Sequence, residues 1–227
     1  MNFQKEWDEK YKQNKQMSIW PWSDLVSYVM RYARPHSGDF KVLELGCGAG
    51  ANIPFFEWLG VKYFAIEGSH TIVSHLSNKF PKLEENIVAG DFTETIPFDG
   101  PFDLVVDRSS LTHNKTSAII NALSLVLGRL KPGGKFIGID WFSTEHAAYF
   151  EGENLEDPFT KCNYRTGQFA DIGVVHFSSR EHLEYLFADF VIETLEHKII
   201  RRDKQLDAEC GKVFAAWNFV AIKRISR

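Results

Sequence analysis

A short apolar run that ends in alternating glycines is the strongest constraint on this chain. Residues 41–45 read Lys-Val-Leu-Glu-Leu, and Gly46, Gly48 and Gly50 follow. An apolar run of this length bounded by glycine is typical of a buried strand. Glycine adopts positive φ angles and lets a ligand lie directly against the backbone. Because the next segment predicts a helix, whose free N–H groups attract polar or anionic atoms, we expect a nucleotide-binding turn here.

Strands and helices then alternate without interruption to residue 140. Buried strands are expected at 41–45, 61–66, 86–89, 102–107 and 135–140, and helices at 52–59, 69–80 and 115–130. The fourth of these strands is nearly apolar throughout, as a strand covered on both faces should be. Five strands with helices between them predict a parallel sheet with right-handed crossovers.

The end of the chain follows another pattern. A helix is expected at 179–187, and two β-rich runs follow at 191–200 and 213–222. Consecutive strands joined by a turn are antiparallel neighbours, and the basic run at 198–204 is interpreted as this solvated turn. The predicted fold is therefore an α/β doubly wound sheet, mostly parallel, that ends in an antiparallel strand pair and carries helices on both faces.

The length of the chain suits one domain, which divides into four parts. Residues 1–38 form a helical N-terminal arm, 40–140 a cofactor-binding core, 141–178 an insertion on the substrate side, and 179–227 the last helix with the closing strands. Trp20 and Trp22 of the arm have two open interpretations. They form either a hydrophobic staple that holds the arm to the domain or a lid over the ligand.

Composition disfavours several classes of protein. Of 227 residues, 44% are hydrophobic and the formal net charge is −4, so a protein that mainly grips nucleic acid is not expected. The three scattered cysteines indicate neither a disulfide framework nor a metal site, and they favour the reducing cytoplasm. The polar N-terminus predicts no signal peptide. The lack of a run of about 18 apolar residues predicts no membrane span.

These motifs resemble the class I (Rossmann-like) S-adenosylmethionine-dependent methyltransferases over residues 40–225. The resemblance rests on Glu-Leu-Gly-Cys-Gly-Ala-Gly at 44–50, Glu67, Gly-Asp-Phe at 90–92, the strand at 102–107 and Leu-Lys-Pro-Gly-Gly-Lys at 130–135. Each motif is weak alone, whereas their order and spacing are specific. The resemblance implies S-adenosyl-L-methionine as the cofactor.

A nicotinamide-binding domain is the main alternative, because Gly46, Gly48 and Ala51 also satisfy the looser dinucleotide fingerprint. Glu67 stands close to the distance of about 20 residues expected of a ribose-binding acid. A dehydrogenase, however, needs a second half or domain for nicotinamide and substrate, whereas one sheet fits this chain. The turn at 131–134 and the closing antiparallel pair are also the methyltransferase ending, so we prefer the methyltransferase interpretation.

The resemblance assigns ten residues to the cofactor. They are Glu44, Gly46, Cys47, Gly48, Glu67, Gly68, Ser69, Asp91, Phe92 and Asp107. Gly46 and Gly48 would let the methionine portion lie against the backbone. Glu67 would accept hydrogen bonds from both ribose hydroxyls, and Asp91 would accept one from the adenine amine.

Methyl transfer from a sulfonium needs chiefly alignment of the reacting atoms, and a general base only when the acceptor is a weak acid. His113 is the best-placed base, and Asp107 is the other catalytic candidate. A loop histidine bonded to backbone is the alternative for His113. The residues expected at the substrate are Trp20, Trp22, Arg108 and His176. For Arg108, pairing with a neighbouring acid is the competing interpretation, and no metal is expected.

The sequence thus predicts a cytoplasmic methyltransferase that moves a methyl group to a small-molecule acceptor, with oxygen as the expected atom. The alternatives are a cofactor-binding protein without catalysis and a methyltransferase acting on RNA or protein. Residues 107–110 read Asp-Arg-Ser-Ser where families that methylate nucleic-acid amines carry Asn-Pro-Pro-Tyr, which disfavours nucleic acid. No membrane partner is expected, and the oligomeric state is left open.

Overall fold

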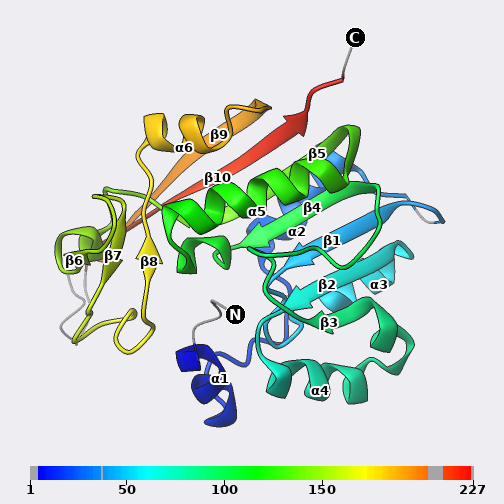
Figure 1. The fold of residues 1–227 in the computed structure, drawn as a ribbon, viewed down its shortest axis with the longest axis horizontal. Coiled ribbons are helices and arrows are strands. Elements are labelled where there is room, and N and C mark those ends of the chain that lie inside the picture. The colour runs from blue at the N-terminus through cyan, green and yellow to red at the C-terminus, as the bar shows by residue number, and fades with distance from the viewer. Residues whose placement is uncertain (1–4, 37, 204–211, 226–227) are drawn as a thin grey trace.

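A seven-stranded sheet forms the centre of the computed structural model, which describes residues 5–36, 38–203 and 212–225 (Figure 1). The strands lie in the order β3 (Ile87–Ala89), β2 (Lys62–Glu67), β1 (Lys41–Leu45), β4 (Phe102–Arg108), β5 (Leu130–Phe142), β10 (Val213–Lys223) and β9 (Phe190–Arg201). Strands β1 to β5 are parallel, whereas β10 runs antiparallel to both β5 and β9. The predicted sheet with its antiparallel ending is confirmed.

Alternating side chains along the central strands create two apolar faces. Val42 and Val106 belong to one buried cluster, and Leu43 and Val105 belong to the other. The first face is covered by α2 (Ser23–Tyr28), α3 (Ile53–Leu59) and α4 (His70–Lys79), and the second by α5 (Thr116–Arg129) and α6 (Arg180–Leu186). In Figure 1, α5 lies in front of the sheet. The central strands are largely apolar because helices cover both faces.

Helix α1 of the N-terminal arm and the insertion lie on the side toward which the parallel strands point (Figure 1). Helix α1 (Lys5–Lys12) packs against α4, and the π-helix η1 (Val29–Ala33) continues α2. The insertion contains η4 (Ala147–Phe150) and a small antiparallel sheet of β6 (Glu153–Asn154), β7 (Thr160–Cys162) and β8 (Val175–His176). The short turns η2 (Pro81–Asn86) and η3 (Leu111–His113) precede β3 and α5. None of the helices described here is long and apolar enough to cross a bilayer.

The interpretation of the basic run at 198–204 as a solvated turn is wrong for its first part. Residues 198–201 lie in β9 and pair with β10, and residue 204 lies outside the described residues. The Lys198 ammonium forms ion pairs with Asp24 of α2, at 2.7 Å, and with Asp140 of β5. Two carboxylates that the fold brings together therefore bind this lysine, and neither lies near it in sequence.

Candidate functional site

A cavity of about 340 Å³ lies at the carboxyl ends of the parallel strands. This volume falls within the range of small-molecule and cofactor sites. Its walls include residues at or just after the ends of β1, β2, β3, β4 and β5, around the point where the strand order reverses between β1 and β4. The following residues assigned from the sequence line it: Glu44, Gly46, Cys47, Gly48, Glu67, Gly68, Asp91, Phe92, Trp22, Arg108 and His113.

The glycine turn adopts the backbone that its composition predicts. Gly46, Gly48 and Gly50 have φ angles of +67°, +50° and +78°. A Cβ atom on Gly46 would lie 2.4 Å from the Cβ of Ser110, which follows β4. A Cβ atom on Gly48 would lie 3.2 Å from the Tyr11 hydroxyl of α1. Glycine is therefore required both for the backbone conformation and for the close approach of neighbouring segments.

Glu67 connects the end of β2 to the glycine turn. Its side chain is buried, and its carboxylate accepts hydrogen bonds from the backbone N–H of Gly48 at 2.8 Å and of Ser69 at 3.0 Å. Burial raises the pKa of Glu67, and these backbone hydrogen bonds oppose the shift. The carboxylate therefore both lines the cavity and holds the turn in place.

Glu44 lies beneath the same turn. Its carboxylate accepts hydrogen bonds from the Asn52 amide at 2.7 Å and from the Tyr63 hydroxyl at 2.5 Å. Burial raises the pKa of Glu44 to about 7 despite these bonds. Burial also raises the pKa of the Cys47 thiol well above its ordinary value, so this thiol is a small lining group and not a nucleophile at neutral pH.

The segment after β3 is shaped by Asp91, whose Oδ1 accepts hydrogen bonds from the Thr93 N–H at 2.9 Å and the Thr93 hydroxyl at 2.6 Å. Asp91 and Phe92 line the cavity beside the end of β2. Ser69 is not among the lining residues, because its hydroxyl caps α4 by accepting the Ile72 N–H and donates to Asp8.

Asp107 is fully buried and does not line the cavity. Its Oδ1 accepts hydrogen bonds from the backbone N–H of Ser110 at 3.2 Å and of Leu111 at 2.9 Å. Burial raises its pKa to about 6, and the bonds from Ser110 and Leu111 oppose that shift. In this structure the carboxylate therefore positions η3, the turn that carries His113.

His113 lines the cavity among aromatic rings. Its imidazole packs edge-on against Trp7, with 4.8 Å between ring centroids, and also contacts Phe142 and Phe169. Its Nδ1 lies 3.4 Å from the Val174 carbonyl oxygen. Burial lowers the pKa of His113 to about 4, so the ring is neutral at pH 7, the state that a proton acceptor requires.

The residues expected at the substrate separate into two pairs. Trp22 and Arg108 line the cavity, and the Arg108 guanidinium stacks 3.5 Å from the Trp22 ring centroid while donating to Asp140 at 3.0 Å. The structure thus shows the acid pairing foreseen for Arg108. Trp20, which is 75% exposed, does not line the cavity. His176 does not line it either, because β8 buries this histidine in the insertion.

Asp140 was not predicted from the sequence, nor were lining residues that only folding brings together. These include Trp7, Tyr11, Asn52, Phe169 and Phe214. A signal for Asp140 was present, since it ends the predicted fifth strand and ligands of open α/β sheets bind outside the carboxyl ends of strands. The aromatic residues of the arm and insertion carry no comparable positional signal.

Neutral His176 makes the stability of the fold depend on pH. Burial and the nearby His182 lower its pKa from 6.5 to about 3. As the pH falls below about 6.5, the unfolded chain binds a proton that the folded protein does not, so the free energy of unfolding decreases. We expect His176→Gln to reduce the loss of stability between pH 7 and pH 5 by about 2 kcal/mol. Urea unfolding at both pH values measures this loss, with exposed His70→Gln as the control; an equal effect of the two variants would contradict the prediction.

Comparison with known proteins identifies the central part of the chain. Residues 42–134 match a family described as a methyltransferase domain. The chain is 32% identical over 71 residues to a protein-L-isoaspartate O-methyltransferase of Flavobacterium johnsoniae, covering 30% of this chain and 33% of the relative. It is 29% identical over 151 residues to a human thiol S-methyltransferase, covering 62% of this chain and 60% of the relative. The chain thus spans about a third to three fifths of the length of the curated relatives that it matches.

Solved structures resemble the whole fold. One is the 1,6-didemethyltoxoflavin-N1-methyltransferase of Burkholderia thailandensis with bound 1,6-didemethyltoxoflavin and S-adenosylhomocysteine. Its TM-score is 0.62 at 17% identity, and the match covers 89% of this chain and 77% of that structure. At this level of identity the likeness establishes the fold, which is the Rossmann-like arrangement expected from the sequence.

Proposed function

We propose that the chain is a class I S-adenosylmethionine-dependent methyltransferase, and that it transfers a methyl group from S-adenosyl-L-methionine to an oxygen atom of a small-molecule acceptor. The observation that carries the acceptor class is the cavity wall: Trp7, Tyr11 and Trp22 of the arm line it together with the ends of the strands. A site walled by the arm favours a ligand small enough to be enclosed over a segment of a macromolecule. We also propose a cytoplasmic location, because the described cysteines Cys47 and Cys162 are free.

The chemistry of the cavity fits the cofactor. Three acidic side chains, Glu44, Glu67 and Asp91, line the cavity, and when ionised they complement a ligand with sulfonium and ammonium charges. The bare backbone of Gly46 and Gly48 would hold its methionine portion. Glu67 would accept from the ribose hydroxyls, while Asp91 and Phe92 would border the adenine.

The cofactor supplies an electrophilic methyl group, and the electron pair of the breaking carbon–sulfur bond stays with sulfur. The acceptor oxygen would form the new bond to the methyl carbon, and neutral His113 would take up the hydroxyl proton. If Nδ1 carries the proton and donates to the Val174 carbonyl, Nε2 is the basic nitrogen. Asp107 supports this step by holding η3, and the surrounding aromatic rings exclude water.

Calorimetric titration with S-adenosylmethionine and S-adenosylhomocysteine tests the proposal first. We expect saturable binding of both, and no binding of NAD at the same concentrations, because one sheet offers no site for nicotinamide. Absence of binding at millimolar concentration would refute the proposed activity. NAD binding in place of the two sulfur ligands would instead restore the dehydrogenase interpretation.

Turnover then separates an enzyme from a binding protein. The release of S-adenosylhomocysteine is measured with a low-molecular-weight metabolite fraction, with protein and with RNA as acceptors. We expect release with the metabolite fraction alone. Release with protein or RNA alone would move the activity to the macromolecular alternative, and binding without release from any fraction would indicate a non-catalytic protein.

A further inference from the structure

A β-bulge in β5 changes the direction of Asp140. Gly138 pairs with Phe219, and Trp141 pairs with Trp217. Between these two pairs β5 contains two residues and β10 contains one, so β5 carries one extra residue. Asp140 lies within this bulge and has a φ of +56°. Bulges beside ligand sites re-aim a side chain. Here the re-aimed residue lines the cavity although only 6% of its surface is exposed.

The surroundings of Asp140 maintain this unfavourable backbone. Its N–H donates to the Asn218 side-chain oxygen at 2.9 Å, and its carbonyl accepts from the Ser109 hydroxyl at 2.9 Å. Ser109, at the end of the neighbouring strand β4, also has a φ of +56°. Ser109 and Asp140 are neighbours in space, both have a left-handed backbone, and both line the same cavity. Strained backbone of this kind clusters at functional sites, so it indicates that this part of the cavity has a function.

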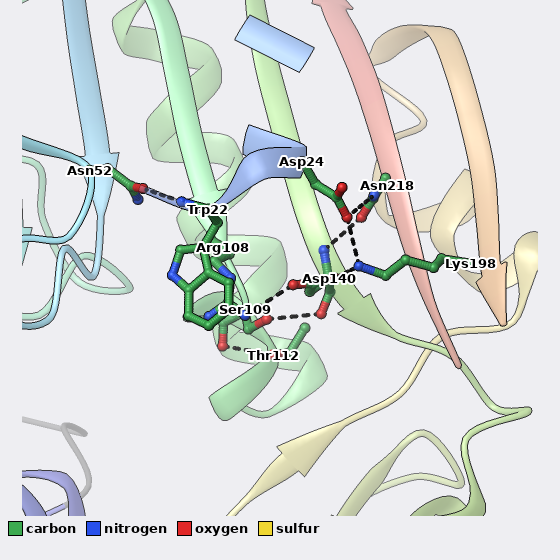
Figure 2. A network of polar contacts seen from close by, with 9 residues as sticks. All are labelled: Trp22, Asp24, Asn52, Arg108, Ser109, Thr112, Asp140, Lys198 and Asn218. Atoms are coloured by element: carbon green, nitrogen blue, oxygen red, sulfur yellow. Dashed lines mark hydrogen bonds and ion pairs between the residues drawn. The ribbon is translucent and has the colours of Figure 1, made fainter. Parts of the chain in front are cut away.

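Two cations hold the Asp140 carboxylate from opposite sides (Figure 2). Arg108 donates to Oδ2 at 3.0 Å, and the Lys198 ammonium pairs with Oδ1. Lys198 also pairs with Asp24, whose carboxylate accepts from Asn218 at 3.3 Å. Each carboxylate oxygen has more than one lone-pair site, so the carboxylate retains the capacity to accept a hydrogen bond from a ligand.

The charges of this network balance. Arg108 and Lys198 are positive, and Asp24 and Asp140 are negative, which gives two charges of each sign and a sum of zero. His113, on the same cavity, is neutral at pH 7 because burial lowers its pKa to about 4. A charged acceptor would therefore meet no uncompensated opposite charge at this end of the cavity.

Several aromatic rings line the same cavity as Asp140. The Arg108 guanidinium lies over the Trp22 ring, 3.5 Å from the ring centroid, in a cation–π contact. Other rings that line the cavity are Trp7, Phe142, Phe169 and Phe214, and the first three of these contact or surround His113. Rings prefer stacked or edge-on contacts with other rings, so a planar aromatic ligand suits this wall.

We propose that Asp140 is an acceptor-binding residue, and that the acceptor is an uncharged aromatic small molecule. One of its hydroxyl groups, other than the one that is methylated beside His113, donates a hydrogen bond to this carboxylate. The inference rests on the methyltransferase function proposed above and adds the chemical class of the substrate. Arg108 and Lys198 are positioning residues, since they act by orienting Asp140.

Three probes on one aromatic scaffold test this acceptor class: 2-naphthol, 2-methoxynaphthalene and 2-naphthoate. Each is titrated by calorimetry into protein saturated with S-adenosylhomocysteine at pH 7, where 2-naphthol is uncharged. We expect 2-naphthol to bind about tenfold more tightly than either of the others, as one hydrogen bond to a charged group implies. Tighter binding of 2-naphthoate would overturn the proposal, because Arg108 would then recognise an anion.

The variant Asp140→Asn tests the residue itself. Asparagine tolerates a left-handed backbone, so the bulge is expected to survive and thermal unfolding verifies it. The preference for 2-naphthol over 2-methoxynaphthalene should shrink to less than about threefold, while the affinity for S-adenosylhomocysteine stays the same. Asp39→Asn, which breaks an exposed ion pair with Lys62, is the matched control and should retain the preference.

The outcomes separate this proposal from the proposed function. If S-adenosylhomocysteine binds but none of the three probes does, the acceptor class is refuted and the methyltransferase function stands. If the preference persists in Asp140→Asn, Asp140 is only a structural partner of Lys198. If S-adenosylhomocysteine itself fails to bind, both proposals fall.

Discussion

Replacing Glu67 by alanine is expected to weaken binding of S-adenosylhomocysteine by about 1–3 kcal/mol, which is roughly fivefold to more than a hundredfold in Kd. Two effects add. The ribose hydroxyls would lose a charged acceptor. The N–H groups of Gly48 and Ser69 would also lose their partner, so the glycine turn would lose the bond that ties it to β2.

Glu67→Gln is the matched control for this prediction. The amide keeps one oxygen that accepts a hydrogen bond but loses the second acceptor and the negative charge. We therefore expect an affinity between those of the wild-type protein and Glu67→Ala. Calorimetry on samples that circular dichroism shows to be folded measures all three. An affinity unchanged in Glu67→Ala would mean that the end of β2 does not contact the ligand.

The second large effect is expected from Gly46→Ala, which should lower the free energy of unfolding by about 2–4 kcal/mol. The φ of Gly46 is +67°, a left-handed value that disfavours a side chain. The added Cβ would also lie 2.4 Å from the Cβ of Ser110, far inside contact distance. Urea unfolding measures the loss, and cofactor binding should weaken in parallel because the turn must move.

Two further variants make this prediction specific. Gly128→Ala, in α5, adds a Cβ with no atom within 4 Å, so it should leave stability unchanged or raise it by up to about 1 kcal/mol. In a double-mutant cycle, Ser110→Gly removes the atom that the new Cβ meets and should restore part of the loss. If Ser110→Gly restores nothing, the whole effect of Gly46→Ala is backbone strain.

Much of the fold follows from local pattern. The order of the apolar runs predicted the parallel strands, and the change of pattern after residue 178 predicted the antiparallel ending. The solvated turn predicted at 198–204 was wrong for its first part, because β9 extends to residue 201 and pairs there with β10. Lys198 looks like part of a solvated basic turn, but Asp24 and Asp140, which are distant in sequence, bind it within the fold.

In the candidate site, too, some residues could be predicted from local sequence patterns and others depended on tertiary contacts. The glycines and Glu67 were recognisable because a turn that requires positive φ and an acid at a strand's end leave a local signature. Asp107 and Ser69 carry such a signature too, yet neither lines the cavity because their polar atoms hold backbone and side-chain groups nearby. A motif specifies where a residue stands in a strand or turn, whereas its hydrogen-bond partners decide which way it faces.

The sequence by itself determined the class of fold and the end of the sheet at which a ligand binds, because strand periodicity and glycine backbone preferences are local properties. Only the tertiary structure decided which residues from outside the core motifs complete the cavity wall. Trp7 and Trp22 from the arm, Phe169 from the insertion and Asp140 from a bulge meet there. These residues come together because distant segments pack against one another and because β5 carries one extra residue. The spacing of the sequence motifs predicts neither.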